Sequence, residues 1–262
     1  MPAAPTPASA SRLRERLRTG APIVGTFVKL AALETIDIAS SAGSDLVIVD
    51  GEHAQLDQSE CLALVRHAAA VGLPAIVRIP AVDAGYVNRL LEAGAAGIQL
   101  SSLRACSERD ALVAASRYPP DGTRSVSLAH PAADYGAVPL GAYLERSKGG
   151  PLLVGQIETA TTVDPLDKLL PGLDVAFIGT TDLSVDLGRP GVLDDERVRA
   201  RVMEIAGAAE RATVALGAWV ASAEALGALP GLRLRYVIVG SDLQLLRAGV
   251  ANTLAAARSA LA

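Results

Sequence analysis

Residues 45–54 read DLVIVDGEHA, and the middle of this stretch is an apolar run without polar alternation. A strand with one face in water alternates polar and apolar residues, whereas a parallel strand covered by helices on both faces does not. Residues 46–50 are therefore predicted to form a buried parallel strand. Asp50, Glu52 and His53 stand where that strand ends. They form either a solvated turn or a chemical site.

The same kind of run recurs along the chain, each time followed by a helical pattern. We expect strands at 25–29, 46–50, 74–79, 97–100, 152–158, 174–179, 216–220 and 236–240. We expect helices at 33–41, 56–71, 84–93, 107–117, 165–170, 194–212, 223–228 and 243–261. Such an eightfold alternation is typical of an α/β fold, the (β/α)8 TIM barrel, built as a single domain. An open or mixed sheet is the alternative.

The ends of the chain and one long connection complete this prediction. Residues 1–20 are expected to form an N-terminal tail and a short helix, and residues 21–262 the barrel with its C-terminal helix. The connection at 118–150 is rich in Gly, Pro and Ser. A loop of this length usually has a role, such as covering a site.

Composition excludes several classes of function. The 262 residues are 50% hydrophobic with a net charge of -4, and no basic cluster suggests a nucleic-acid partner. No apolar run approaches the roughly 20 residues that span a bilayer, so no membrane partner is expected. Cys61 and Cys106 lack metal-ligand spacing and suggest a reducing compartment. The cytoplasm is the expected location.

In a TIM barrel the active site lies at the carboxyl ends of the strands, and charged residues gather there in this chain. The residues concerned are Asp50, Glu52, His53, Arg78, Gln156, Glu158, Gly179, Thr180, Thr181 and Asp182. The acids outnumber the one arginine, and a divalent cation would restore the balance. Glu158 and Asp182 are hard oxygen donors on neighbouring strands, which suits Mg²⁺ or Mn²⁺. The alternative is that each acid pairs with a basic residue at the rim.

The remaining polar residues also have two interpretations each. Arg78 either binds a carbonyl or anionic oxygen through its fork or forms an ordinary ion pair with Asp50 or Glu52. His53 is either a general acid or base oriented by Asp50 or a surface residue. The backbone N–H groups of the turn 179–182 either hold an anion or cap a helix. His67 is predicted to lie on the surface, and His130 reaches the site only if the long loop is a lid.

The motifs in this order resemble those of the HpcH/HpaI aldolase family. They are DGEHA (50–54), VRIP (77–80), RYPPDGTRSV (117–126), QIET (156–159) and IGTTDLSVDLG (178–188). The resemblance implies a metal-dependent class II aldolase, a carbon–carbon lyase acting on pyruvate and related 2-oxo acids with an aldehyde. It also implies a homo-oligomer, a hexamer or trimer, in which the C-terminal helix packs between subunits.

The resemblance further implies a role for each site residue. Glu158 and Asp182 hold Mg²⁺, Mn²⁺ or Co²⁺, with Gln156 beside the ion and Glu52 in the surrounding water network. Arg78 contacts the keto oxygen, and the backbone of Thr181 and Asp182, in the turn that also contains Gly179 and Thr180, receives the substrate carboxylate. His53, supported by Asp50, relays the proton of the aldol hydroxyl.

Departures from the family pattern occur at Phe27, at 99–102 and at 124–127, and all are expected on the substrate side of the site. An imine mechanism needs a lysine, and of three lysines only Lys29 is near a strand end, so this route is disfavoured. Three alternatives to an aldolase stay open: oxaloacetate decarboxylation, cleavage of a CoA thioester, and a non-catalytic barrel that binds a 2-oxo acid.

Overall fold

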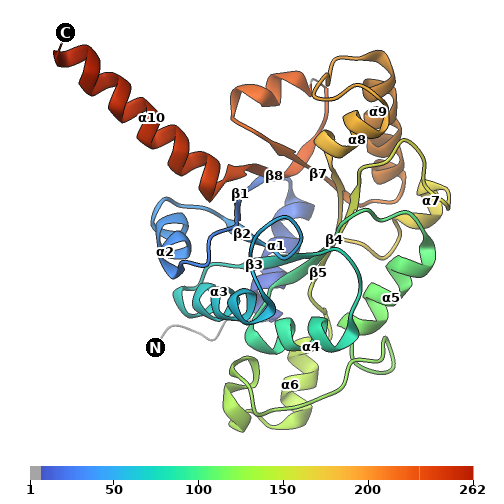
Figure 1. Cartoon of the computed structure of the whole chain (residues 1–262). Helices are drawn as coiled ribbons and strands as arrows, with labels where there is room; N and C mark the ends of the chain where they lie inside the picture. Colours follow the sequence, from blue (N-terminus) through green and yellow to red (C-terminus); the bar gives the residue numbers. More distant parts are fainter. Residues whose placement is uncertain (1–6, 230, 262) are drawn as a thin grey trace.

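The computed structural model describes residues 7–229 and 231–261, and its centre is a closed barrel of parallel strands, β1 to β8 in sequence order (Figure 1). The strands are Ile23–Val28, Leu46–Asp50, Ala75–Ile79, Gly97–Leu100, Leu152–Ile157, Val175–Ile178, Ala215–Val220 and Leu234–Ser241. β1 pairs with β8 in parallel, which closes the ring. The predicted TIM barrel is thereby confirmed.

Helices surround the barrel. The α-helices α1 to α10 are Pro7–Thr19, Leu33–Ser41, Gln58–Val71, Ala84–Ala93, Cys106–Ser116, Leu140–Ser147, Leu166–Leu169, Thr180–Asp186, Glu196–Arg211 and Asp242–Leu261. Two 3₁₀ helices, η1 and η2, are Pro131–Gly136 and Glu224–Ala228. Helix α3 begins two residues later than expected because Asp57 and Glu60 form a capping box that fixes its start. None of the helices in the described ranges is long and apolar enough to cross a membrane.

The strands divide their side chains between two apolar clusters. On β2, Leu46 and Ile48 pack inside the barrel, whereas Val47 and Val49 pack beneath the helices. Because side chains alternate along a strand, Asp50 points the same way as Leu46 and Ile48. The last inward position of a strand is thus where a side chain reaches the mouth of the barrel.

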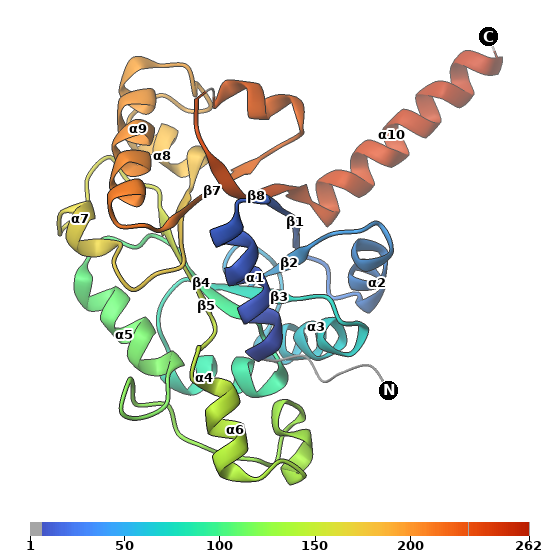
Figure 2. The same ribbon diagram turned by 180° about the vertical axis from the view of Figure 1, so that it is seen from behind.

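The amino-terminal end of the barrel is closed by α1, which Figure 2 shows lying across it. Leu13 and Leu17 of α1 join the inner apolar cluster. Arg14 donates from Nη2 to the carbonyl of Pro151 at 2.6 Å and from Nε to Asp174 Oδ1 at 2.6 Å.

The long connection at 118–150 is not a lid over the barrel mouth. It contains η1 and α6, which we did not predict, and it joins the end of α5 to the start of β5, at the amino-terminal end of the barrel. There its residues line a small cavity together with Ala10 of α1. His130 is buried beside Tyr143 of α6, and the imidazole Nε2 lies 2.8 Å from the carbonyl of Ser127. His130 therefore has no access to the site through this loop.

Helix α10 leaves the barrel directly from β8 and projects away from the other helices (Figure 1). None of its residues is buried, although Leu245, Leu246, Val250 and Leu254 are apolar. These side chains border an apolar groove of about 860 Å³ between α10, β1 and α2.

Candidate active site

A cavity of about 500 Å³ lies at the carboxyl ends of the strands. The predicted residues that line it are His53, Arg78, Gln156, Gly179, Thr180, Thr181 and Asp182. They come from β2, β3, β5 and β6 and the segments that follow these strands, so the fold gathers residues that are far apart in sequence.

Asp50 is the most buried acid of the site, and it pairs with two basic side chains. Its carboxylate accepts hydrogen bonds from Arg78 Nε at 2.9 Å and Arg78 Nη2 at 2.6 Å, and Lys29 Nζ lies 2.8 Å from Oδ2. The bidentate pair arises because Asp50 and Arg78 are register partners on β2 and β3. Burial alone would raise the pKa of Asp50, but the hydrogen bonds and charge of Arg78, and then Lys29, hold this pKa well below its ordinary value.

His53 stands on the turn after β2 with its imidazole largely open to the cavity. Its side chain is 59% exposed, and Nε2 lies 3.8 Å from Glu52 Oε2. Asp50 Oδ1 accepts the backbone N–H groups of Glu52 and His53 at 3.2 and 3.1 Å. Asp50 therefore orients the backbone of His53, and the expectation that it orients the imidazole is corrected accordingly.

Glu158 follows β5 and is 5% exposed. Its Oε1 accepts from the backbone N–H of Ser102 at 2.8 Å and from the Ser102 hydroxyl at 2.5 Å, and its Oε2 accepts from Gln156. These donors fix the carboxylate in one orientation. Ser102 was expected on the substrate side of the site, but it contacts the predicted metal ligand instead.

Asp182 lies in the first turn of α8 and is exposed to the cavity. Gly179 precedes the helix, and the first N–H groups of a helix have no intrahelical acceptor. A Cβ atom at Gly179 would lie 2.5 Å from Glu158 Oε2. Glu158 therefore packs directly under the turn that carries Asp182.

The donor set fits a hard divalent cation held by two carboxylates. Residues 7–229 and 231–261 contain no cluster of three or more His, Cys, Asp or Glu side chains suited to a metal. Mg²⁺ commonly takes one or two carboxylates and completes its shell with water and substrate oxygens. Nearby, Glu52 Oε2 and Gln99 Oε1 are buried without a hydrogen-bond donor, so this region is rich in acceptors.

Sequence reasoning expected Phe27 and Ser101, the latter within 99–102, on the substrate side of the site but did not identify their partners, and it missed Lys29 as a polar residue of the site. Lys29 was considered only as an imine former, yet it continues the inward series of Ile23 and Phe27 on β1 and lines the cavity. Phe27 lies under Arg78, with the guanidinium carbon 4.5 Å from the ring centre. The Ser101 hydroxyl donates to Glu52 at 2.7 Å. Applying the two-residue period of β1 to its end would have identified Lys29.

The segment at 124–127, also expected on the substrate side, lies in the connection at the opposite end of the barrel. Arg124 donates to Asn88 of α4 at 2.8 Å, and its guanidinium carbon is 4.5 Å from the centre of the Tyr118 ring. Within one chain this segment is part of the packing around α4 rather than of the cavity.

Comparisons with known proteins find aldolases that are similar to this chain. A hydroxypyruvate/pyruvate aldolase of Agrobacterium fabrum (strain C58) is 30% identical over 258 residues, which cover 95% of this chain and 93% of the relative. A 4-hydroxy-2-oxovalerate aldolase of Rhodococcus jostii (strain RHA1) is 33% identical over 181 residues, which cover 68% of this chain and 69% of the relative.

A solved structure and a family model extend the match over most of the chain. The crystal structure of an HpcH/HpaI aldolase from Desulfitobacterium hafniense DCB-2 superimposes with a TM-score of 0.86 at 29% identity, covering 94% of this chain and 96% of that one. The model of the family described as HpcH/HpaI aldolase/citrate lyase matches residues 24–248. The chain therefore belongs to the HpcH/HpaI aldolase/citrate lyase family, as the motifs at its strand ends indicated.

Proposed function

We propose that the protein is a divalent-metal-dependent aldolase that cleaves or forms a 4-hydroxy-2-oxo acid through a pyruvate-type enolate. The observation that carries the proposal is the packing of Glu158 beneath the Gly179–Asp182 turn, beside the cavity that Arg78 and His53 line. The names of the relatives, hydroxypyruvate/pyruvate aldolase and 4-hydroxy-2-oxovalerate aldolase, support a 2-oxo acid and an aldehyde as substrates.

Glu158 and Asp182 would hold the cation, Mg²⁺, Mn²⁺ or Co²⁺. When bound, it supplies Lewis-acid stabilisation of the negative charge that develops on the keto oxygen. Gln156 orients Glu158. Glu52, whose Oε2 accepts no hydrogen bond from the described residues and lies 3.5 Å from Arg78 Nε, belongs to the water network around the ion.

Arg78 and His53 carry the remaining chemistry in this proposal. Asp50 engages Nε and Nη2 of Arg78, which leaves Nη1 to donate to the keto oxygen. In the cleavage direction His53 takes the proton of the 4-hydroxyl group while the C3–C4 bond breaks, giving an aldehyde and the pyruvate enolate. The enolate carbon then takes a proton from water and His53 releases the proton it had accepted, which gives pyruvate and restores the imidazole. The free N–H groups of Thr180, Thr181 and Asp182 receive the substrate carboxylate.

We also propose that the protein is a homo-oligomer, as a hexamer or a trimer, with α10 packed on a second copy. Helix α10 exposes Leu246 and Val250 by 59% and 51%, while Val24 and Ile38 border the adjoining groove with 45% and 65% exposure. An apolar helix and an apolar groove on one chain would both be covered by exchange of α10 between two copies. A cytoplasmic location is in keeping with two free cysteines, Cys61 and Cys106.

The experiment is a retro-aldol assay that follows pyruvate release from a 4-hydroxy-2-oxo acid. Chelation with EDTA should abolish pyruvate release, and Mg²⁺, Mn²⁺ or Co²⁺ should restore it. Glu158→Gln should fail to recover with added metal, whereas His53→Ala should lose activity but keep its Mn²⁺ affinity. Release that survives both chelation and Glu158→Gln would refute the proposal. Oxaloacetate decarboxylation measured in parallel separates an aldolase from a decarboxylase.

A further inference from the structure

Lys29, the residue that follows β1, is a basic side chain of the site in addition to Arg78, and two acceptors hold it. Lys29 Nζ lies 2.8 Å from Asp50 Oδ2 and donates to the backbone carbonyl of His53 at 3.1 Å. The Lys29 side chain is 21% exposed and lines the cavity. An amine that donates to a carboxylate and a carbonyl is oriented toward those acceptors, which does not suit it to attack a carbonyl carbon.

The turn that carries His53 has few contacts of its own. For the backbone of residues 52–55, the hydrogen bonds within the described ranges are those from the N–H groups of Glu52 and His53 to Asp50 and that from Lys29 to the His53 carbonyl. A segment with so few backbone hydrogen bonds opens easily unless its few contacts persist. Lys29 therefore donates one of these three hydrogen bonds that hold the backbone of this turn.

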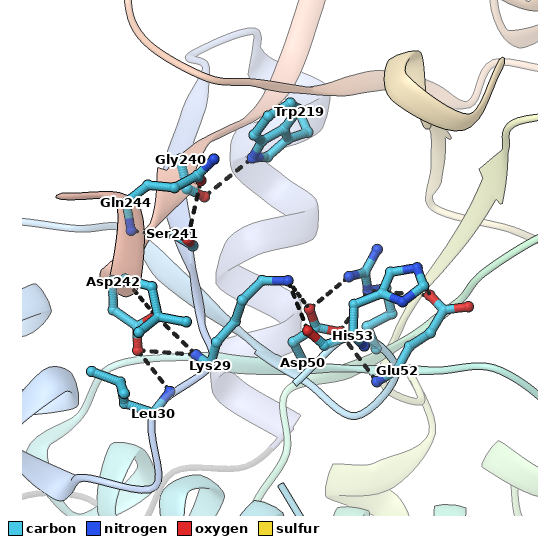
Figure 3. A network of polar contacts seen from close by, with 12 residues as sticks. Lys29, Leu30, Asp50, Glu52, His53, Trp219, Gly240, Ser241, Asp242 and Gln244 are labelled. Carbon is cyan, nitrogen blue, oxygen red and sulfur yellow. Dashed lines mark hydrogen bonds and ion pairs between the residues drawn. The ribbon is translucent and has the colours of Figure 1, made fainter. Parts of the chain in front are cut away.

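The backbone of Lys29 is in turn held by the start of α10. Asp242, the first residue of α10, accepts the backbone N–H of Lys29 at 2.9 Å and that of Leu30 at 3.0 Å. Trp219 Nε1 donates to the carbonyl of Gly240 at 3.1 Å in the same corner. Figure 3 shows the contacts running from Asp242 through Lys29 to Asp50 and the His53 turn.

We propose that Lys29 is a positioning residue, whose hydrogen bond to the His53 carbonyl holds the turn at 52–55 so that the His53 imidazole faces the substrate. Asp242, the first residue of α10, holds the backbone of Lys29 in place. The inference rests on the proposed role of His53 in the aldolase reaction. It gives the lysine a role other than imine formation, because Asp50 and the His53 carbonyl both engage its amine.

The test compares Lys29→Met, Lys29→Arg and the control Lys148→Met, a surface lysine paired with Glu145. Asp50 keeps its bidentate partner Arg78 in all three, so the barrel should fold. We expect Lys29→Met to lower kcat of the retro-aldol reaction by about 10- to 100-fold, because the proton acceptor is misplaced. KM and Mn²⁺ affinity should stay within about twofold, since the substrate and metal ligands are untouched. Lys29→Arg should restore most of kcat.

Hydrogen–deuterium exchange of residues 50–56 provides a measurement that does not depend on activity. Exchange should be faster in Lys29→Met than in the wild type and unchanged in Lys148→Met. Unchanged exchange and kcat in Lys29→Met would overturn the proposal, as would borohydride trapping of a pyruvate adduct on Lys29. If the wild type releases no pyruvate, the aldolase function fails, and the exchange data still decide whether Lys29 holds the turn.

Discussion

Gly179 is the position where the smallest change should disrupt the proposed metal site. An added Cβ atom would lie 2.5 Å from Glu158 Oε2, 2.6 Å from Glu158 Cβ and 3.2 Å from Gln156 Nε2. Ordinary contact begins at 3.4–4 Å, so either Glu158 or the start of α8 must move by about 1 Å. The φ of Gly179 is -82°, which suits alanine, so the perturbation is the overlap with Glu158 and the tight approach to Gln156.

The expected effects of Gly179→Ala follow from that displacement. Overpacking should lower the free energy of unfolding by about 1–3 kcal/mol, which a barrel of this size tolerates. Displacing the orienting contacts of a metal ligand typically costs about 10- to 100-fold in metal affinity. A misplacement of about 1 Å costs on the order of 100-fold in rate, so kcat/KM should fall by about that factor.

The assay is a Mn²⁺ titration followed by electron paramagnetic resonance, with thermal unfolding measured on the same samples. Gly141→Ala is the matched control, because no heavy atom lies within 4 Å of the corresponding Cβ position in α6. It should leave Mn²⁺ affinity and activity unchanged. Wild-type Mn²⁺ affinity in Gly179→Ala would show that the position of Glu158 does not determine metal binding.

Two further predictions concern stability and assembly. Asp50→Asn removes the bidentate carboxylate from buried Arg78, which among the described carboxylates keeps only Glu52 Oε2 at 3.5 Å, and should lower the free energy of unfolding by about 3 kcal/mol. Because the folded-state pKa of Asp50 is depressed, this stabilisation is full above about pH 4 and is lost as pH falls. Below that pH, the free energy of unfolding measured with denaturant should therefore depend less on pH in Asp50→Asn than in the wild type. Equal pH dependence in the two proteins would contradict the proposed contribution of the ion pair. Leu246→Glu with Val250→Glu should reduce the mass measured by light scattering, because both side chains belong to the exposed face of α10. An unchanged mass would exclude α10 from the interface.

Local sequence patterns were sufficient for the barrel and for most of the candidate site. The strands are short apolar runs without polar alternation, and most are followed by a helical pattern, as expected for a parallel barrel covered by helices. The boundaries of β2 and β4 agree with those expected. Asp50 and Arg78 are in contact, and Glu158 follows β5 at the same rim, because parallel strands end on one side of the barrel.

The topology of the fold was enough to predict on which end of the barrel the connection at 118–150 lies. A segment that follows a helix and precedes a strand lies at the amino-terminal end of a (β/α)8 barrel, so topology places 118–150 away from the site. Its length alone suggested a lid. The helices α6 and η1 inside it have weak local signals and pack on α1 and α4, contacts that no local pattern specifies.

The sequence by itself determined the fold, the family and the residue types at the barrel mouth, because burial periodicity and strand-end motifs are local properties. Only the tertiary structure decided which partner each polar side chain takes. Asp50 engages Arg78 and Lys29 rather than the His53 imidazole, and Ser102 engages Glu158. The physical reason is that strand register and barrel closure set these distances, and a carboxylate binds the nearest strong donors that closure brings to it.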